Sequence, residues 1–139
     1  MKPFKFYHPI EIRYGDLDPQ GHVNNAKFLT YFEQTRVQYL IHLGLFSKDQ
    51  SFLEVGIILA EATVTFRAPL RYGEEVWVGA GVTRLGNKSI HMAYSLEDKQ
   101  SGKTYTEGSA IIVTFDYRNQ ETITIPDPWR AAIAQFEGL

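Results

Sequence analysis

The sequence predicts an α+β domain in which an antiparallel sheet wraps around one long helix. A single long helical pattern near the N-terminus is followed by several segments of strand-like alternation, joined by short connections. Helices and strands that occupy separate stretches of a chain are typical of α+β domains. The 139 residues contain no internal repeat or low-complexity linker. We therefore expect one domain over residues 1–139, with five or six strands.

The long helix is expected between Ala26 and Leu43. Apolar residues recur there every three to five positions, and Gly44 stands where a helix terminator belongs. Asn24 or Asn25 is the expected N-cap, because a short side-chain oxygen can accept hydrogen bonds from the free amides of the first turn. The recurring apolar positions are Ala26, Leu29, Phe32, Val37, Leu40 and Leu43.

One strand is expected before the helix, over residues 5–14, where apolar and polar side chains alternate. This period of two is typical of a strand with one buried face. After the helix and a loop over 47–56 the alternation returns several times, and the last strand is more continuously apolar. The later strands are expected over residues 61–68, 75–83, 90–96 and 104–117.

Short, turn-like connections separate the strands that follow the helix. Connections of this length favour antiparallel hairpins, and we expect one at each of 71–74, 85–88 and 98–102. A short closing helix is expected over 128–136, where a proline stands at the first helical position. The sequence thus predicts a meander of strands beside the long helix.

Charge and composition exclude several classes of protein. Fourteen basic and sixteen acidic side chains give a formal charge of -2, so a positive field that holds a nucleic acid is not expected. Zero cysteines remove disulfides, thiolate metal sites and cysteine nucleophiles. No apolar run is long enough for a signal peptide or a membrane span. We expect a cytoplasmic protein without membrane association.

Motifs of other hydrolases and of metal sites are missing from the sequence. No serine lies in a Gly-x-Ser-x-Gly elbow, and the four histidines do not form the i, i+4 pair of zinc hydrolases. Gly102-Lys103-Thr104 has the end of a phosphate-binding loop, but Glu97 stands where its first glycine belongs. We therefore expect neither a metal nor a cofactor.

The segment that leads into the long helix combines residue types that carry chemistry. Asp16 and Asp18 lie two residues apart, and His22 follows four residues later, just before two asparagines. Spacing alone favours a capped loop, since Asp and Asn commonly satisfy local amides in turns. Asp16 is expected to hold the loop rather than to react.

The same segment resembles a known enzyme family. Its pattern Tyr-x-Asp-x-Asp-x-x-Gly-His-Val-Asn-Asn is similar to that of the 4-hydroxybenzoyl-CoA thioesterase family of hotdog proteins. Its second half resembles the His-Val-Asn-Asn motif of plant acyl carrier protein thioesterases. The segment Phe-Arg-Ala-Pro-Leu-Arg-Tyr-Gly-Glu over 66–74 resembles the second signature of the family, so the resemblance covers nearly the whole chain. It also includes Phe28, Tyr31, Glu33 and Arg36.

The resemblance implies an acyl-CoA thioesterase of the hotdog fold, with the long helix in the concave face of the sheet. It implies that Asp18 occupies the catalytic carboxylate position, close to the substrate carbonyl. Two protomers of such proteins usually join edge to edge with the acyl site between them, so we expect a homodimer or a homotetramer. His22 and Asn25 depart from the bacterial hydroxybenzoyl enzymes, and this departure favours aliphatic over aryl acyl groups.

Thioester hydrolysis needs an attacking group and stabilisation of the oxyanion that forms. Asp18 can attack as a nucleophile or activate water as a general base. Backbone amides around Val23, Asn24 and Asn25, at the positive end of the helix dipole, are the expected oxyanion donors. His22 either assists, by binding the carbonyl oxygen or orienting Asp18, or is an ordinary loop histidine.

Other residues are candidates for contact with the rest of the substrate. Tyr14 and Tyr31 are candidates for lining the acyl pocket, although aromatic residues on a strand and a helix are core residues by default. The nucleotide end of CoA is anionic, so basic residues at hairpin ends are expected to bind it, unless they are ordinary solvated charges. These candidates are Arg67, Arg71, Arg84 and Lys88, with Asn87 and Ser89 beside them.

Three alternative functions fit the same sequence. A hotdog domain can bind acyl-CoA without catalysis, it can act as a hydratase or dehydratase, or the thioester can be carried by an acyl carrier protein instead of CoA. Asp18 weighs against a purely binding role, and its loop resembles the thioesterase branch most closely. Release of a free thiol distinguishes hydrolysis from the other chemistry.

Overall fold

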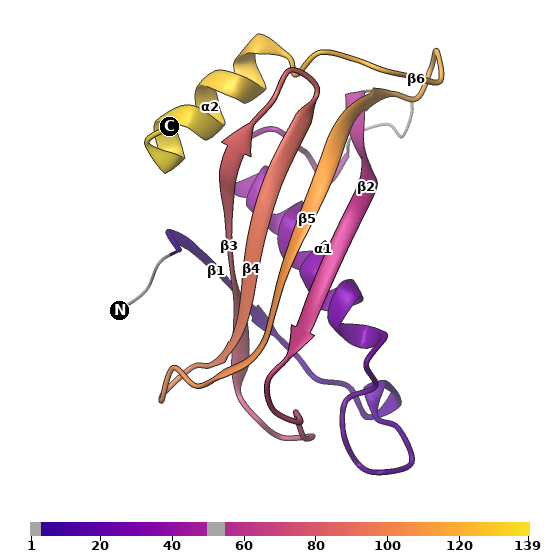
Figure 1. The fold of residues 1–139 in the computed structure, drawn as a ribbon, viewed down its shortest axis with the longest axis vertical. Helices are drawn as coiled ribbons and strands as arrows, with labels where there is room; N and C mark the ends of the chain where they lie inside the picture. Colours follow the sequence, from indigo (N-terminus) through magenta and orange to yellow (C-terminus); the bar gives the residue numbers. More distant parts are fainter. Residues whose placement is uncertain (1–3, 50–54) are drawn as a thin grey trace.

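A six-stranded antiparallel sheet lies across the long helix α1 in the computed structural model, which describes residues 4–49 and 55–139. Figure 1 shows α1 behind the sheet, with the second helix, α2, at one end. The strand order is β1-β3-β4-β5-β2, and β6 pairs with β5. The elements are β1 (Phe6–Ile10), a 3-10 turn (Tyr14–Asp16), α1 (Lys27–His42), β2 (Val55–Phe66), β3 (Val76–Leu85), β4 (Ser89–Asp98), β5 (Thr104–Asp116), β6 (Glu121–Thr122) and α2 (Asp127–Glu137).

The predicted α+β class is confirmed, but one predicted hairpin is wrong. The turns at 85–88 and 98–102 do join neighbouring antiparallel strands, β3 to β4 and β4 to β5. Strand β2, however, pairs with β5 and not with β3. The connection at 67–75 therefore crosses the end of the sheet, because β2 and β3 lie on opposite sides of β4 and β5. Turn-forming residues indicate that the chain reverses direction, but they do not determine which strands pair.

Helix α1 lies within one residue of its predicted boundaries, and its C-terminal end is as expected. Gly44 has a φ of +77°, the left-handed conformation that glycine adopts most readily after a helix. The predicted N-cap is wrong in position, since the structure places the N-cap at Ala26. Asn24 still supplies a capping bond, because its Oδ1 accepts from the Ala26 amide at 2.9 Å.

The face of α1 that packs on the sheet differs in part from the predicted apolar stripe. Phe32 and Leu40 are buried as expected, but Leu29 is 44% exposed. Leu29 faces the space between α1 and β2, and so does not contribute to the core. The buried face instead includes the polar side chains of Thr35 and Arg36, which a search for apolar residues does not detect.

Phe32 brings the helix very close to the sheet. Its ring stacks on that of Tyr94, with centroids 4.9 Å apart and an interplanar angle of 9°. The ring also covers Gly108 on β5, where an added Cβ would lie 2.5 Å from Phe32 Cε2 and 2.8 Å from the Thr63 carbonyl oxygen. Only a residue without a side chain fits at this point of the sheet.

The first strand is shorter than its alternating pattern predicts. Strand β1 ends at Ile10, and the backbone turns at Tyr14–Asp16. The Asp16 carboxylate accepts from the Arg13 amide at 3.1 Å, and the Asp16 amide donates to the Arg13 carbonyl at 2.9 Å. These local bonds offer the backbone an alternative to a sheet ladder, so the chain leaves the sheet before the aspartates.

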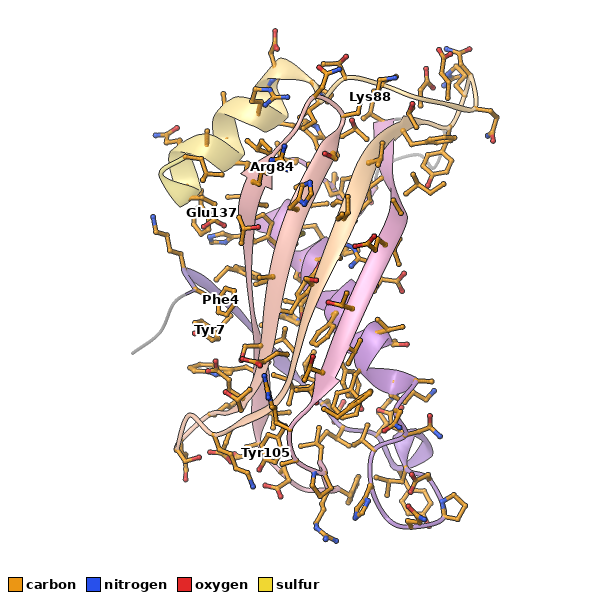
Figure 2. The ribbon with its side chains drawn as sticks, in the orientation of Figure 1. Phe4, Tyr7, Arg84, Lys88, Tyr105 and Glu137 are labelled. Atoms are coloured by element: carbon orange, nitrogen blue, oxygen red, sulfur yellow. The ribbon has the colours of Figure 1, made fainter. Side chains whose placement is uncertain are left out.

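The two edges of the sheet are unequal. Strand β1 has five residues, including Pro9, which has no amide hydrogen to donate. Where β1 no longer covers β3, the Glu137 carboxylate at the end of α2 accepts from the Val82 amide at 3.0 Å and from the Tyr39 hydroxyl at 2.6 Å. Figure 2 shows Glu137 reaching β3 from α2. One edge is thus short and covered.

The opposite edge, strand β2, has twelve residues and pairs on one side only. Its start at Val55 precedes the prediction, and residues 50–54 of the predicted loop lie outside the described residues. Large apolar side chains stay in solvent along it: Ile58 is 41% exposed, and Leu59 and Phe66 are each 48% exposed. A long edge with exposed apolar residues is suited to pairing with another strand.

Candidate functional site

The loop that carries Asp18 is a tight reversal between the 3-10 turn and α1. The Asp18 amide donates to the His22 carbonyl at 2.8 Å, and Leu17 pairs with Val23 across the loop. The loop is also joined to the crossing connection, because the Val23 amide donates to the Leu70 carbonyl at 2.8 Å. The two segments that resemble the family's signatures are therefore in direct contact.

The Asp18 carboxylate is half-buried and oriented by its own loop. Its Oδ1 accepts from the Gln20 amide at 2.9 Å and from the His22 amide at 3.3 Å. No residue in 4–49 or 55–139 donates to Oδ2. One oxygen fixes the side chain, and the other is available to attack a carbonyl or to take a proton from water.

Asp16 is a structural residue of the same loop. It is 2% exposed, and its Oδ2 accepts from the Tyr31 hydroxyl at 2.7 Å and from the Arg13 amide. Burial by itself would raise its pKa, but these two bonds and the charges of Arg13 and Lys27 together hold the pKa below its ordinary value. Burial and the bond to Asp16 raise the pKa of Tyr31. The ionised carboxylate thus ties the loop to α1.

Two of the three amides that were expected to bind the oxyanion already donate to backbone carbonyls. The Val23 amide is used by Leu70, and the Asn24 amide donates to the Asp16 carbonyl at 2.8 Å. Within the described part of the chain, the Asn25 amide has no acceptor. Phe28 and Leu29 lie in the first turn of α1. Amides in the first turn of a helix have no acceptor within the helix, so these two can donate to a ligand.

His22 and Tyr14 lie at the surface of the single chain. His22 is half-buried, and its backbone forms an isolated antiparallel β-bridge with that of Arg71. The His22 ring makes no hydrogen bond within the described residues. Tyr14 is 80% exposed and makes an edge-to-face contact with Tyr72, with centroids 6.2 Å apart. In the single chain, Tyr14 is thus a solvent-exposed residue beside Tyr72 and not a core residue.

A groove separates α1 from the edge strand β2. It contains two adjacent hollows of about 130 and 260 Å³, with Thr30, Glu33, Arg36 and Leu59 common to both. The groove extends along the helix from Leu29 near its start. Its walls combine apolar side chains from both elements with the polar side chains of Thr30, Glu33 and Arg36, and the exposed edge strand forms one side.

The basic residues predicted to bind the nucleotide are divided between the two ends of the sheet. Figure 2 places Arg84 and Lys88 at the end near α2, with Tyr105 at the opposite end. The β3–β4 turn therefore lies far from the Asp18 loop of the same chain (Figure 1). Lys88 Nζ donates to Thr122 Oγ1 at 3.2 Å. Arg67 lies nearer the Asp18 end but pairs with Glu107 at 2.8 Å.

Two features of the groove and the turn were missed by sequence reasoning. Arg36, which the sequence indicated only as part of the family resemblance, is buried, and its Nη1 donates to the Tyr94 hydroxyl. Arg130 of α2 donates to the Gly86 carbonyl at 2.7 Å and so supports the β3–β4 turn. A charged residue four positions after Phe32, inside the apolar stripe of the helix, was the available signal for Arg36.

Neither a metal cluster nor a membrane-spanning helix is found among the described residues. In 4–49 and 55–139, no three His, Asp or Glu side chains gather in a way that could hold a metal ion. No helix in the same ranges is long and apolar enough to cross a membrane.

Known proteins resemble this chain over almost its whole length. A family model described as the Thioesterase-like superfamily matches residues 12–133. The acyl-CoA thioester hydrolase YbgC of Escherichia coli O157:H7 is 20% identical over 99% of both chains. The acyl-acyl carrier protein thioesterase ATL3 of Arabidopsis thaliana is 24% identical over 94% of this chain and 69% of its own. A thioesterase of Thermus thermophilus, solved with coenzyme A and zinc, is 28% identical, covers 100% of this chain and 99% of its own, and has a TM-score of 0.84.

Proposed function

Because the chain belongs to the Thioesterase-like superfamily, and is an enzyme of the thioester hydrolase class, we propose that it converts an acyl-CoA to the free acid and CoA. The observation that carries this proposal is the Asp18 carboxylate: two amides hold one oxygen, and no donor from the described part of the chain reaches the other. It stands beside the start of α1, where free amides and the helix dipole favour negative charge.

In the proposed reaction, the thioester carbonyl lies between Asp18 and the first turn of α1. Either Asp18 Oδ2 attacks the carbonyl carbon to give a mixed anhydride, or it takes a proton from a water molecule that attacks. The Asn25 and Phe28 amides are the proposed donors to the oxyanion. The C–S bond then breaks, and the CoA thiolate leaves without needing a strong acid. Attack by water gives the free acid directly, whereas on the other route a water molecule then hydrolyses the anhydride, which releases the acid and restores the Asp18 carboxylate. His22 is proposed to orient the carbonyl.

The acyl chain is proposed to lie in the groove between α1 and β2. The preference for aliphatic over aryl groups is proposed from the His-Val-Asn-Asn motif of the loop, and apolar side chains of the groove such as Leu29 and Leu59 can contact an aliphatic chain. Tyr31 borders the site through its ring only, because its hydroxyl is bonded to Asp16. We place the protein in the aliphatic branch of the hotdog thioesterases rather than with the hydroxybenzoyl enzymes.

The complete site is proposed to form between two copies that pair through β2. Two-fold antiparallel pairing reverses the second sheet, so the end that carries the β3–β4 turn of one copy lies beside the Asp18 end of the other. This arrangement would bring Asn87, Lys88 and Ser89 of one copy near the thioester of its partner. A single chain keeps them at opposite ends of the sheet.

Light scattering is therefore expected to give at least twice the 15.9 kDa of one chain at micromolar concentration. Ile58→Glu places a charge on the exposed edge strand and should produce monomers with little thioesterase activity, because burying an unpaired carboxylate is costly. Thr83→Glu, on an exposed position of β3, is the matched control and should stay dimeric. A wild-type monomer would contradict the shared site.

Neutralising the β3–β4 turn should weaken recognition of the nucleotide. The double variant Arg84→Met, Lys88→Met is expected to raise KM for an acyl-CoA about 10-fold and to leave the same acyl group on pantetheine little changed, because only CoA carries the nucleotide phosphates. The wild-type KM should rise with salt. Lys99→Met, an exposed residue on the β4–β5 connection at the other end of β4, is the control. Equal losses on both substrates would place these residues outside the CoA site.

A thiol-release assay with the purified protein tests the proposed function directly. Saturated acyl-CoA substrates of increasing length, aryl-CoA substrates and the matching acyl carrier protein thioesters should be compared at equal concentration. The proposal expects release of free thiol from aliphatic acyl-CoA. Binding without release would favour a non-catalytic acyl-CoA module, and faster release from carrier-bound chains would favour the activity for which ATL3 is named.

A further inference from the structure

Arg36 is a buried cation with few partners. It lies on α1 and is 6% exposed. Its Nη1 donates to the Tyr94 hydroxyl at 3.1 Å, and its Nη2 lies 4.0 Å from Glu33 Oε2, on a side chain that is 67% exposed. Its Nε is buried and has no hydrogen-bond partner among residues 4–49 and 55–139. A buried guanidinium is costly unless its N–H groups are satisfied.

Tyr94 fixes the orientation of this guanidinium. The Tyr94 hydroxyl accepts from Arg36 Nη1 and donates to Met92 Sδ at 3.4 Å, and its ring is held by stacking on Phe32. With Nη1 occupied, the Nε and Nη2 edge of the guanidinium is the part without a close acceptor. Two parallel N–H groups on that edge match the two oxygens of a carboxylate.

Arg36 also contributes to the wall of the proposed acyl groove. It borders both hollows between α1 and β2, beside apolar residues of the two elements. It lies nine positions after Lys27, which is about 13 Å along the helix from the end near Asp18. A chain bound with its thioester at Asp18 would therefore reach Arg36 with its far end.

From this geometry, and resting on the proposed function, we propose that Arg36 selects acyl chains whose far end carries a carboxylate. The preferred substrate is then the CoA thioester of a medium-length dicarboxylic acid. The terminal carboxylate accepts from Nε and Nη2 of Arg36 and replaces the distant contact with Glu33. A methyl-ended chain of equal length leaves the buried N–H groups unsatisfied and binds less well.

The wild-type protein tests this selectivity with substrates of equal length. Octanedioyl-CoA and octanoyl-CoA differ only at the far end of the chain, and kcat/KM is expected to be at least 10-fold higher for octanedioyl-CoA, with decanedioyl-CoA and decanoyl-CoA as a second pair. Equal values, or a preference for the methyl-ended chains in both pairs, would overturn the inference and leave the proposed function intact.

Binding separates the failure of the inference from the failure of the proposed function. The non-hydrolysable thioethers S-(7-carboxyheptyl)-CoA and S-octyl-CoA can be compared by calorimetry even if no substrate is hydrolysed. Tighter binding of the carboxylate-ended thioether supports the role of Arg36 whatever the turnover. Equal binding indicates that Arg36 serves the fold or is satisfied by water or a second copy, and rejects the inference.

Variants of Arg36 should change the ratio of kcat/KM for octanedioyl-CoA to kcat/KM for octanoyl-CoA. Arg36→Met keeps the length and apolar stem of the side chain and is expected to remove the preference, whereas Arg118→Met, an exposed residue on the β5–β6 turn, should not change it. Glu33→Gln leaves Arg36 in place, removes the carboxylate that lies 4.0 Å from its Nη2, and should increase the preference several-fold. If Arg36→Met does not fold, Arg36→Lys decides, because it keeps the positive charge but not the two parallel N–H groups: the preference should fall several-fold, and an unchanged ratio would reject the inference.

Discussion

Asp18→Asn is expected to lower kcat for acyl-CoA hydrolysis by roughly 100-fold or more. The amide keeps the size of the side chain and an oxygen that can accept from Gln20 and His22, but it loses the negative charge. General base catalysis alone typically contributes about 10² to 10⁴, and a nucleophile contributes at least as much. Thiol release under saturating substrate measures the effect. A folded variant with turnover within a few-fold of wild type would refute the proposed role.

Asp16→Asn is the matched control for Asp18, since it makes the same chemical change two residues away. Its carboxylate is buried against Tyr31 and the Arg13 amide, so we expect a loss of stability of about 2 kcal/mol, as for other hydrogen bonds to charged groups, and a smaller effect on turnover. Thermal melts of both variants must accompany the kinetics, because a misfolded loop would imitate a catalytic loss.

The stability contribution of Asp16 should depend on pH with a definite sign. Its pKa in the folded protein is below the ordinary value of 3.8, so its ionised form stabilises the fold at any pH above that value. The contribution is lost as the pH falls below 3.8 and through the folded pKa. The difference in Tm between wild type and Asp16→Asn is therefore expected to shrink only in that acidic range.

Gly108→Val is expected to destabilise the fold strongly. The new Cβ would come within 2.5 Å of the Phe32 ring and 2.8 Å of the Thr63 carbonyl oxygen, and one of these contacts is backbone within the sheet. Overpacking of this kind costs about 3 kcal/mol, against a gain of at most about 1 kcal/mol from the better strand propensity of valine. The net loss should lower Tm by several degrees, roughly 5 to 10 °C.

Gly15→Ala provides the comparison for Gly108→Val. An added Cβ at Gly15 meets nothing within 4 Å, and no positive φ is found there. This change should leave Tm within about 2 °C of wild type. If Gly108→Val melts like Gly15→Ala, Phe32 and the sheet can separate easily, and the close packing of α1 does not limit stability.

The sequence predicted the elements of the fold better than their pairing. The spacing of Phe32 and Leu40 located α1, and strand alternation located β3, β4 and β5, because these patterns depend on local periodicity. The partner of β2 is set by contacts between distant residues, such as Val64 opposite Gly108. No local pattern carries that information, and the connection at 67–75 was therefore interpreted as a hairpin.

The candidate site could be predicted only where one segment contains the whole motif. The Asp18 loop has the compact, hydrogen-bonded form that its Asp, Gly and Asn residues favour. The Val23 amide, predicted as an oxyanion donor, is instead bonded to Leu70, which is 47 positions later in the chain. Arg36 was missed for a similar reason, since its burial depends on Tyr94 of a different element.

The unequal edges of the sheet bear on how far association can proceed. The short β1 edge, with Pro9 and the cover from Glu137, offers few free amides to an incoming strand. Pairing of two copies through β2 would use the long edge of each and leave a short, blocked edge at either end of the joined sheet. Association by strand pairing would then stop at two chains. The monomer can therefore have an edge strand that is free to pair without forming fibres.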